Sequence, residues 1–456
     1  MLSPFPSIAD AVRRIKAGDL SPRELVEHCL ARIEQFDERV KAWVLVDAKG
    51  ARRQAEELAR VAAGDQAAGD QAGFDPAGFD PAGSLPLLGV PIAIKDIVDV
   101  AGMPTKAGSP LREGHVAERD APLAARLRQH GAILLGKTVT TEFAGFDPSP
   151  TRNPWNLAHT PGGSSSGSAA AVPLEMCLGA IGSQTGGSIN RPAAYCGAAG
   201  LKPTHGAIPL EGVVPVSFTL DHPGPIARSV DDLRILFEVL SNQTVSTSQL
   251  TSPPRLFRLG GFFDEQCDDP LRQVVDKAVE KLAHADANIE RIEPPASFEQ
   301  VHAMHRRIMA AEAAAYHRAQ FGRHREQFGR HITALIEEGL SLPAADYLEA
   351  LEHRRRFRLE LTNQLGDRVA VLPATTCTAP GSLESTGDPA FNSPFSYAGV
   401  PSLNFPCGLA DDGMPCGLQL VAGPDRESAL LAAAAWCERV LDVNLRPPLL
   451  PEEGRE

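Results

Sequence analysis

In the first part of the chain, polar and apolar positions follow a helical periodicity. Apolar residues recur every three or four positions over residues 7–17, 21–36 and 51–63, which predicts three amphipathic helices. The run Ser21-Pro-Arg-Glu24 supplies an N-cap, a first-turn proline and a capping-box glutamate. These signals mark the start of the second helix.

Further along, continuous apolar runs alternate with helical patterns. The apolar run over residues 87–95 predicts a buried strand ending in Lys95, and the pattern that follows predicts a helix over residues 122–130 and a strand over residues 132–135. The C-terminal part has a similar pattern, which predicts strands over residues 369–372, 401–406 and 417–422 and a last helix over residues 427–440. This alternation favours an α/β sheet over an all-β sandwich.

Three segments depart from this pattern. Residues 64–83 repeat GDQA and GFDPAG units without a packing period, which predicts a disordered low-complexity insertion. Residues 161–187 are expected to be a glycine-rich loop, an alanine-rich helix from Ser168 and a second loop. Residues 299–363 are poor in glycine and proline, so we expect a helical excursion over residues 250–365 within one domain, residues 1–456.

Bulk properties exclude several classes of function. The 44 basic and 57 acidic residues leave a formal charge of −13, which argues against nucleic acid or an anionic membrane as a partner. The eight cysteines are scattered without a CxxC pair, so neither a zinc site nor a disulfide framework is predicted. The N-terminus lacks a signal-peptide core and no run is long enough to span a bilayer. We therefore expect a cytoplasmic protein.

Two glycine-serine blocks are the main candidates for chemistry. Gly162-Gly-Ser-Ser-Ser-Gly-Ser168 and Ser183-Gln-Thr-Gly-Gly-Ser188 place Ser164 and Ser188 24 positions apart. Glycine lets the backbone approach a ligand closely, and successive N–H groups on such a turn can hold an anion. A serine needs a base to act as a nucleophile, and burial can lower the pKa of a lysine such as Lys95 enough to serve.

Each of these residues has an ordinary structural interpretation when taken alone. Lys95 would be a surface charge at a strand end, Ser164 part of a flexible linker, and Ser188 a helix N-cap. Asp96 points to the other side of the strand and need not pair with Lys95. Neither block contains a phosphate-binding GxxxxGK[ST] or a dinucleotide-binding GxGxxG motif. Jointly, the three residues favour a nucleophile, a proton relay and a base.

The two blocks and the run Gly89-Val-Pro-Ile-Ala-Ile-Lys95 resemble the amidase signature family. Supporting matches include Gly197-Ala-Ala-Gly-Leu-Lys-Pro-Thr204 and Asp221-His-Pro-Gly-Pro-Ile-Ala-Arg-Ser229, and the resemblance runs from about residue 7 to residue 441. It implies a large, mixed, twisted β-sheet covered by helices on both faces. It also implies an amidase, a hydrolase of linear amides that needs no metal or cofactor.

The resemblance assigns a role to each candidate. Ser188 would be the acyl-forming nucleophile, Ser164 the bridging serine after a cis peptide bond, and Lys95 the terminal base. Thr185, Gly186 and Gly187, with the N–H of Ser188, would hold the oxyanion. Expected partners are a small amide substrate and, at most, a second copy of the chain in a homodimer.

Two departures from the usual family pattern bear on the substrate. Gln184 stands where many members have aspartate, and Arg191 lies three residues after the nucleophile rather than two. Both features are similar to the branch with malonamidase and biuret hydrolase, which implies that Arg191 clamps a substrate carboxylate; a structural ion pair is the alternative. Ser183 and Gln184 are further candidates for substrate binding, with Tyr195 and Ser217 weaker. In the later loop, Asp388 or Asn392 faces substrate, or Asp388 only shapes a turn.

Six histidines, His302, His305, His317, His324, His331 and His353, gather in the helical excursion. No HExxH motif accompanies them, so solvated basic helix faces are expected rather than a metal site. The leading hypothesis is an amidohydrolase that releases ammonia or an amine from a small linear amide. The first alternative is the A-type glutaminase subunit of a tRNA-dependent amidotransferase, which needs a protein partner. The second is an inactive binding protein with the same fold.

Overall fold

A computed structural model describes residues 2–64, 85–245, 250 and 252–450 of the chain. Within these residues, eleven strands form one mixed sheet in the order β1-β3-β2-β4-β6-β5-β10-β11-β9-β7-β8. The strands are β1 (Trp43–Val46), β2 (Pro91–Lys95), β3 (Ile133–Thr138), β4 (Gly179–Gln184), β5 (Ala199–Lys202), β6 (His222–Ala227), β7 (Leu256–Leu259), β8 (Ile289–Ile292), β9 (Val369–Pro373), β10 (Ser402–Leu409) and β11 (Pro415–Val421). The predicted α/β class is confirmed.

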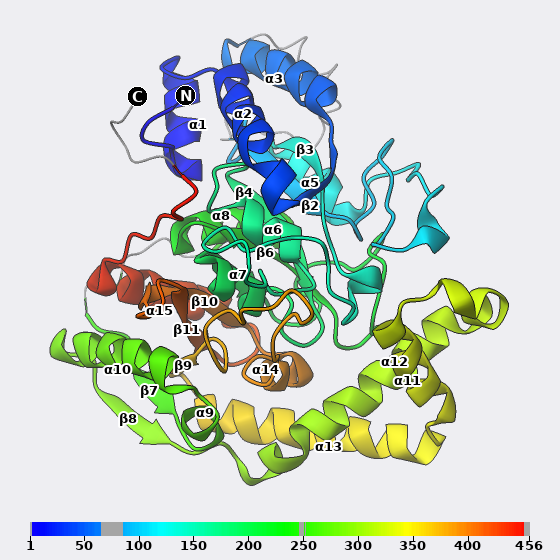
Figure 1. Cartoon of the computed structure of the whole chain (residues 1–456). Coiled ribbons are helices and arrows are strands. Elements are labelled where there is room, and N and C mark those ends of the chain that lie inside the picture. Colours follow the sequence, from blue (N-terminus) through cyan, green and yellow to red (C-terminus); the bar gives the residue numbers. More distant parts are fainter. Residues whose placement is uncertain (1, 65–84, 246–249, 251, 451–456) are drawn as a thin grey trace.

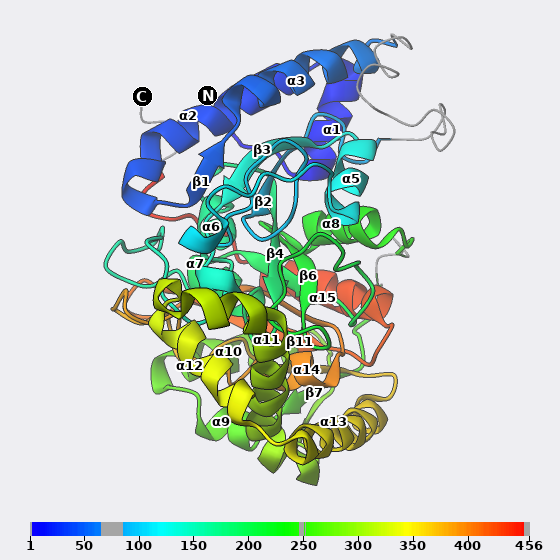
Figure 2. The same cartoon turned by 90° about the vertical axis from the view of Figure 1, so that its right-hand side faces the viewer.

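Helices cover both faces of the sheet. Figure 2 shows α6 and α7 on one side of the central strands and α8 and α15 on the other. The helices are α1 (Ile8–Ala17), α2 (Pro22–Val40), α3 (Ala48–Ala62), α5 (Pro122–Gln129), α6 (Ser166–Ala171), α7 (Asn190–Cys196), α8 (Val230–Ser241), α9 (Phe262–Glu265), α10 (Asp269–His284), α11 (Val301–His324), α12 (Arg330–Ser341), α13 (Ala344–Leu365), α14 (Ser393–Ala398) and α15 (Glu427–Leu441). In the described part of the chain, none of them is long and apolar enough to cross a membrane.

The N-terminal helices follow the sequence signals closely. Ser21 caps α2 by accepting a hydrogen bond from the Glu24 N–H, and the Glu24 carboxylate accepts one from the Ser21 N–H, so the predicted capping box is confirmed. The helix runs to Val40, four residues beyond the predicted end, because Phe36 and Val40 still bury apolar side chains. The predicted insertion, residues 64–83, lies outside the described residues except for Gly64.

The prediction for residues 250–365 is wrong in its first part. Residues 256–259 and 289–292 form β7 and β8, a parallel pair that extends the sheet beyond β9. From residue 301 onward the segment consists of helices joined by short turns. Here α11, α12 and α13 pack together beside α14 at one end of the molecule (Figure 1). This arrangement places α11 next to the chain that follows β4.

Candidate active site

Lys95 is the last residue of β2, which lies between β3 and β4 in parallel orientation. Its side chain is fully buried, and its Nζ donates to Ser164 Oγ at 2.7 Å and to Ser183 Oγ at 2.9 Å. Burial lowers the pKa of Lys95 to about 7, against the opposing effect of the nearby Asp221 carboxylate. A substantial fraction of the amine is therefore neutral near pH 7 and able to accept a proton.

Asp96 points to the opposite side of the strand end, as predicted. Its carboxylate lies 3.2 Å from Lys137 Nζ on β3, and both side chains are buried. Burial raises the pKa of Asp96 and lowers the pKa of Lys137, and each residue opposes the shift of the other. Asp96 is therefore taken up by Lys137, and among the described residues Lys95 has no carboxylate within ion-pair distance.

The first glycine-serine block is a tightly packed turn rather than a flexible linker. The Gly163–Ser164 peptide bond is cis, as the resemblance implied. A Cβ at Gly163 would lie 2.7 Å from the Thr386 methyl carbon, so a larger residue there would require Thr386 to move. Ser165 Oγ accepts a hydrogen bond from the Ser183 N–H and donates to the Ser183 carbonyl, both at 3.2 Å. These contacts fix the first block to the end of β4.

The predicted loop between the two blocks is wrong in part. Residues 179–184 form β4, a fully buried strand between β2 and β6. The helix before it, α6, begins at Ser166 and has six residues. The second block therefore begins inside a central strand, and Ser188 follows its carboxyl end.

The second block presents unpaired N–H groups beside a serine. Among the described residues, the N–H groups of Gly186, Gly187 and Ser188 donate to no other group, whereas the next two are taken by one side chain. Gln184 Oε1 accepts from the Ile189 N–H at 2.9 Å and from the Asn190 N–H at 3.0 Å. Three consecutive donors around one hydroxyl are the kind of arrangement that can hold an oxyanion.

Asp221 is a site residue that sequence reasoning did not assign. Its Oδ1 accepts from Thr185 Oγ1 at 2.5 Å, and its Oδ2 accepts from the N–H groups of Val216 and Ser217. Burial raises the pKa of Asp221 to about 6, despite these hydrogen bonds and the charge of Lys95. The only sequence signal was its place at the start of the Asp221–Ser229 motif.

Ser188 opens onto a cavity of about 410 Å³. Within the described part of the chain, its hydroxyl forms no hydrogen bond, including none to Ser164. The cavity walls come from residues 144–146, residues 185–188, Arg191, Val216, four residues of α11, residues 388–390 and Ser393.

The α11 histidines were predicted to be solvated, and this is wrong for the buried ones. His305 and His317 are buried, as is His353 on α13, because α11 packs against α12, α13 and α14 at once. His305 Nε2 lies 3.0 Å from the Thr185 carbonyl oxygen, and burial lowers the pKa of His305 to about 4. His302 also lines the cavity. Among the described residues, no group of three His, Cys, Asp or Glu side chains is placed to hold a metal ion.

The substrate-binding candidates occupy different positions. Arg191 is buried and lines the cavity, and it donates to the Gly163 and Gly387 carbonyls and to Thr386 Oγ1. In the described residues it makes no ion pair, and its Nε has no hydrogen-bond partner. Ser183 faces Lys95, and Gln184 caps α7 from behind the cavity. Substrate binding by these two side chains stays a prediction that their contacts do not favour.

The weaker candidates are mostly engaged elsewhere. Tyr195 is buried and contacts Cys377, and Ser217 Oγ donates to Glu312 at 2.5 Å. Asn392 is buried and donates to the Ala374 carbonyl. The Asp388 carboxylate accepts from the Ala390 N–H within a turn, and the residue also lines the cavity, so its contact with substrate stays a prediction.

Comparison with known proteins gives a consistent family match. The Amidase family model matches residues 24–431. The A-type subunit of glutamyl-tRNA(Gln) amidotransferase from Roseiflexus castenholzii is 33% identical, with 98% of this chain and 98% of that protein covered. The protein of the same name from Synechococcus elongatus is 31% identical over 97% of this chain and 100% of its own length.

Solved structures agree with the sequence comparison. A crystal structure of an amidase superposes with a TM-score of 0.85 at 31% identity, covering 95% of this chain and 99% of the other. Peptide amidase from Stenotrophomonas maltophilia gives a TM-score of 0.80 at 26% identity over 98% and 99% of the two chains. A protein from a vestigial complex linked to the origins of an s-triazine catabolic enzyme gives 0.85 at 29% identity over 97% and 100%. The expected fold, with its mixed sheet between helices, is confirmed.

Proposed function

The chain belongs to the amidase family, and on that premise we propose that it hydrolyses the C–N bond of a small linear amide through a seryl acyl-enzyme. The observation that carries this proposal is the buried Lys95 amine, with a pKa of about 7, held 2.7 Å from Ser164 Oγ. Ser188 lines the catalytic cavity next to three N–H groups that have no partner among the described residues, and its carbonyl accepts from the N–H of Ser165, the residue after Ser164. A base, a relay and a nucleophile with an oxyanion site are what amide hydrolysis requires.

The proposed reaction begins when Ser188 Oγ turns toward Ser164 and attacks the amide carbonyl carbon. The Ser188 proton passes to Ser164 Oγ while the Ser164 proton passes to Lys95 Nζ. The N–H groups of Gly186, Gly187 and Ser188, with that of Thr185, hold the oxyanion. Its collapse breaks the C–N bond, and the protons return along the same path to the leaving nitrogen, which departs as ammonia or an amine.

Water then attacks the acyl-enzyme, gives up a proton by the same relay, and releases the carboxylic acid. Asp221 contributes to both half-reactions through its effects on Lys95 and Thr185. Its carboxylate raises the pKa of Lys95 and so stabilises the cation that forms when the relay delivers a proton. Thr185, which Asp221 binds, belongs to the oxyanion loop, so one carboxylate acts on both the base and the loop.

Labelling with a fluorophosphonate tests the nucleophile independently of substrate identity. We expect a single label on Ser188 and none in Ser188→Ala, which also loses activity. The matched control is Ser341→Ala, an exposed serine at the end of α12. An unlabelled wild-type protein would instead support the inactive binding protein.

The class of substrate can be identified by measuring ammonia release from a panel of malonamate, biuret, glutamine, and aliphatic and aryl amides. Arg191 lines the cavity, and its buried Nε has no hydrogen-bond partner among the described residues, so we propose that it contacts a substrate carboxylate. Arg191→Met should then reduce kcat/KM for malonamate by about tenfold more than for a neutral aliphatic amide. Equal losses would mean that Arg191 only binds the Gly163 carbonyl and does not contact the substrate.

The second candidate function is the glutaminase component of a tRNA-dependent amidotransferase. The observation that favours it is the 31–33% identity, over nearly full length, with proteins of that name. Both functions share the chemistry above, but the glutaminase delivers ammonia to a partner protein. Glutamine hydrolysis that appears only when a partner is added would support this candidate; rapid hydrolysis of other amides by the chain alone would exclude it.

A further inference from the structure

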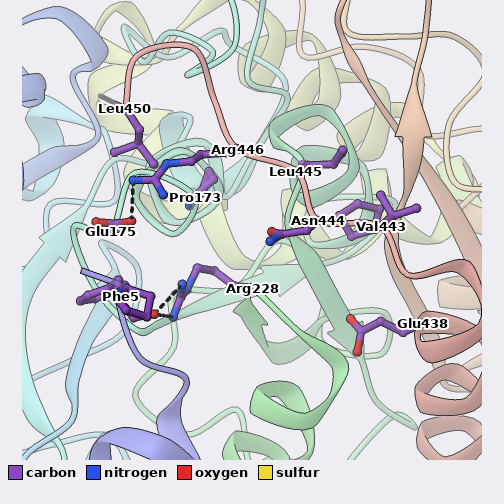
Figure 3. A pocket seen from close by; sticks show the side chains of 13 residues that line it. Phe5, Pro173, Glu175, Arg228, Glu438, Val443, Asn444, Leu445, Arg446 and Leu450 are labelled. Atoms are coloured by element: carbon purple, nitrogen blue, oxygen red, sulfur yellow. Dashed lines mark hydrogen bonds and ion pairs between the residues drawn. The ribbon is translucent and has the colours of Figure 1, made fainter. Parts of the chain in front are cut away.

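A second cavity lies away from the catalytic one, between the first and last segments of the described chain. Its volume is about 500 Å³, and it shares no lining residue with the cavity at Ser188. We call it the terminal cavity. Figure 3 shows Phe5 from the N-terminal segment and Asn444 and Arg446 from the C-terminal segment around it, with Arg228 facing them. This volume suits a metabolite-sized ligand.

Arg228 carries the argument for a ligand. Its guanidinium donates to the carbonyl oxygens of Phe5 and Pro6 and lies 4.7 Å from the Phe5 ring centre. Among the described residues no carboxylate lies within ion-pair distance of it, and its buried Nε has no hydrogen-bond partner. The charge of Arg228 lowers the pKa of Asp232 against the opposing effect of burial, but the two side chains form no ion pair. A half-buried guanidinium without a paired anion is costly to maintain.

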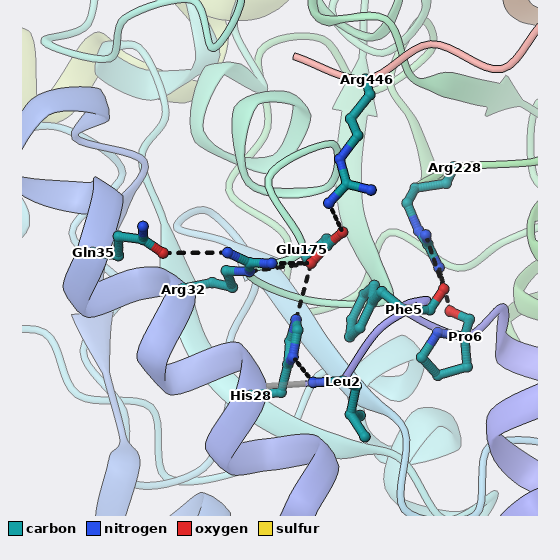
Figure 4. Close-up of polar contacts among 9 residues, drawn as sticks. All are labelled: Leu2, Phe5, Pro6, His28, Arg32, Gln35, Glu175, Arg228 and Arg446. Carbon is teal, nitrogen blue, oxygen red and sulfur yellow. Dashed lines mark hydrogen bonds and ion pairs between the residues drawn. The ribbon is translucent and has the colours of Figure 1, made fainter. Parts of the chain in front are cut away.

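The other charges of the terminal cavity do not supply that anion. Glu175 accepts from His28 Nε2 at 3.0 Å and from Arg32 at 2.9 Å, and its second oxygen lies 3.7 Å from Arg446 (Figure 4). Burial alone would raise the pKa of Glu175, but His28 and Arg32 outweigh it and lower the pKa. Glu175 is therefore already balanced by cations.

Glu438, the remaining acid of the lining, is held by the Val230 N–H at 3.0 Å. Burial raises its pKa to about 7, so it carries less than a full charge at neutral pH. With Glu175 balanced and Glu438 partly protonated, neither acid of the lining supplies a full countercharge to Arg228. The prolines and leucines of the terminal cavity add apolar wall, which suits a carboxylate with a short hydrocarbon part.

The terminal cavity also touches the far ends of the elements that carry the catalytic groups. Glu175 lies in the turn between α6, which follows Ser164, and β4, which leads to Ser188. This turn is held in a left-handed conformation at Glu175, with φ at 60°. Arg228 directly follows β6, and Asp221 directly precedes it. A ligand that shifts these ends acts on buried, tightly packed elements that reach the active site.

We propose that the terminal cavity binds a small organic carboxylate between Arg228 and Arg446 and that its occupancy changes the reactivity of Ser188. The coupling rests on the proposed function, because it requires Ser188 to be the nucleophile; the binding does not. A carboxylate is also what amide hydrolysis releases, so the acid product is a natural source of the ligand.

Titration calorimetry with sodium butyrate, against sodium chloride at equal ionic strength, tests the binding. We expect saturable binding of one butyrate per chain, retained in Ser188→Ala. Arg228→Gln should weaken it by about tenfold or more, and Arg228→Lys by less, because lysine keeps the charge but not the paired donors. Arg446→Gln, a substitution at a partly exposed side chain, should weaken it without disturbing the Phe5 contacts.

The control is Arg234→Gln on α8, where the arginine pairs with Asp231 and Glu238 outside the terminal cavity. Non-saturable binding, or binding unchanged in both Arg228→Gln and Arg446→Gln, overturns the site. Tighter binding of inorganic phosphate than of butyrate overturns the assignment to a carboxylate.

The coupling between the terminal cavity and the active site is measured as the rate at which a fluorophosphonate labels Ser188. An equal rate with and without saturating butyrate overturns the coupling, and absence of labelling shows that the proposed function has failed as well.

Discussion

Replacing Lys95 by methionine should abolish activity and yet stabilise the fold at neutral pH. The pKa of Lys95 falls from its ordinary 10.5 to about 7 because the folded protein buries the amine completely. The difference between these two pKa values corresponds to about 5 kcal/mol of stability lost to burial of the charge once the pH is below about 7. Methionine has a similar length and no charge.

Part of this gain is offset by lost hydrogen bonds. Lys95 donates to Ser164 and Ser183, and each bond contributes about 1 kcal/mol. We therefore expect Lys95→Met to raise the free energy of unfolding by about 3 kcal/mol at pH 7. The sign of the pH dependence follows from linkage: between the folded and unfolded pKa values, the unfolded chain binds the proton more tightly. The penalty is complete below pH 7 and disappears above the unfolded pKa, so the gap between the two proteins should shrink as pH rises.

Urea denaturation of both proteins at several pH values between 7 and 10 measures this gap. The activity of Lys95→Met should fall by about 10²–10⁴ or more, since the general base is gone. Lys277→Met, at an exposed position of α10, is the control and should change neither quantity. A Lys95→Met protein that is less stable than wild type, by an amount independent of pH, would refute the argument that burial of the charge tunes Lys95.

Two other substitutions test side chains that lie next to the proposed oxyanion loop, residues 185–188. Gln184→Leu removes the acceptor for the Ile189 and Asn190 N–H groups, so urea denaturation should show a loss of about 2–3 kcal/mol. Its kcat/KM should fall equally for all amides; a KM effect on one substrate class alone would reveal a direct contact. Asp221→Asn removes a charge that raises the pKa of Lys95, so the acidic limb of the kcat/KM profile should move to lower pH. An unmoved limb would contradict this coupling.

Local signals in the sequence were sufficient for part of the fold and for the candidate triad. The strand that ends at Lys95 was predicted from one continuous apolar run, and the structure buries every residue of β2. The capping box of α2 was readable because all of its parts lie within four residues. The glycine-serine blocks stood out for the same reason: their residues are contiguous, and only their meeting in space needed the fold.

The hydrophobic pattern did not predict β4 and β6, because the composition of these strands is unusual. β4 is Gly-Ala-Ile-Gly-Ser-Gln, and its glycines are required by packing, since a Cβ at Gly182 would lie 2.9 Å from Ser165 Oγ. β6 contains Pro223 and Pro225, which normally argue against a central strand. They are tolerated because the neighbouring β5 pairs only with the last two residues of β6. The missing proline N–H groups therefore face a side where no strand requires them.

Residues supplied by distant segments were also beyond local patterns. His305 reaches the Thr185 carbonyl from 120 positions away, and the α11 sequence around it carries charged residues typical of an exposed helix. It is buried because three other helices surround α11. The periodicity of α11 could not reveal this, since a helix packed on several sides has no single apolar face.

The position of Gln184 links one of the sequence departures to the chemistry of the loop. The Ser396 hydroxyl donates its only proton to the Gly186 carbonyl at 2.8 Å, so toward residue 184 it can only accept, and Gln184 Nε2 donates to it at 3.1 Å. An ionised aspartate has no proton to donate and would draw the Ser396 proton to itself, which would release the Gly186 carbonyl. The Gly186 carbonyl belongs to the same planar peptide unit as one of the proposed oxyanion donors, the Gly187 N–H. The glutamine thus fixes the direction of the hydrogen bonds that orient this donor, and we infer that the departure at residue 184 tunes the oxyanion loop from behind rather than selecting the substrate.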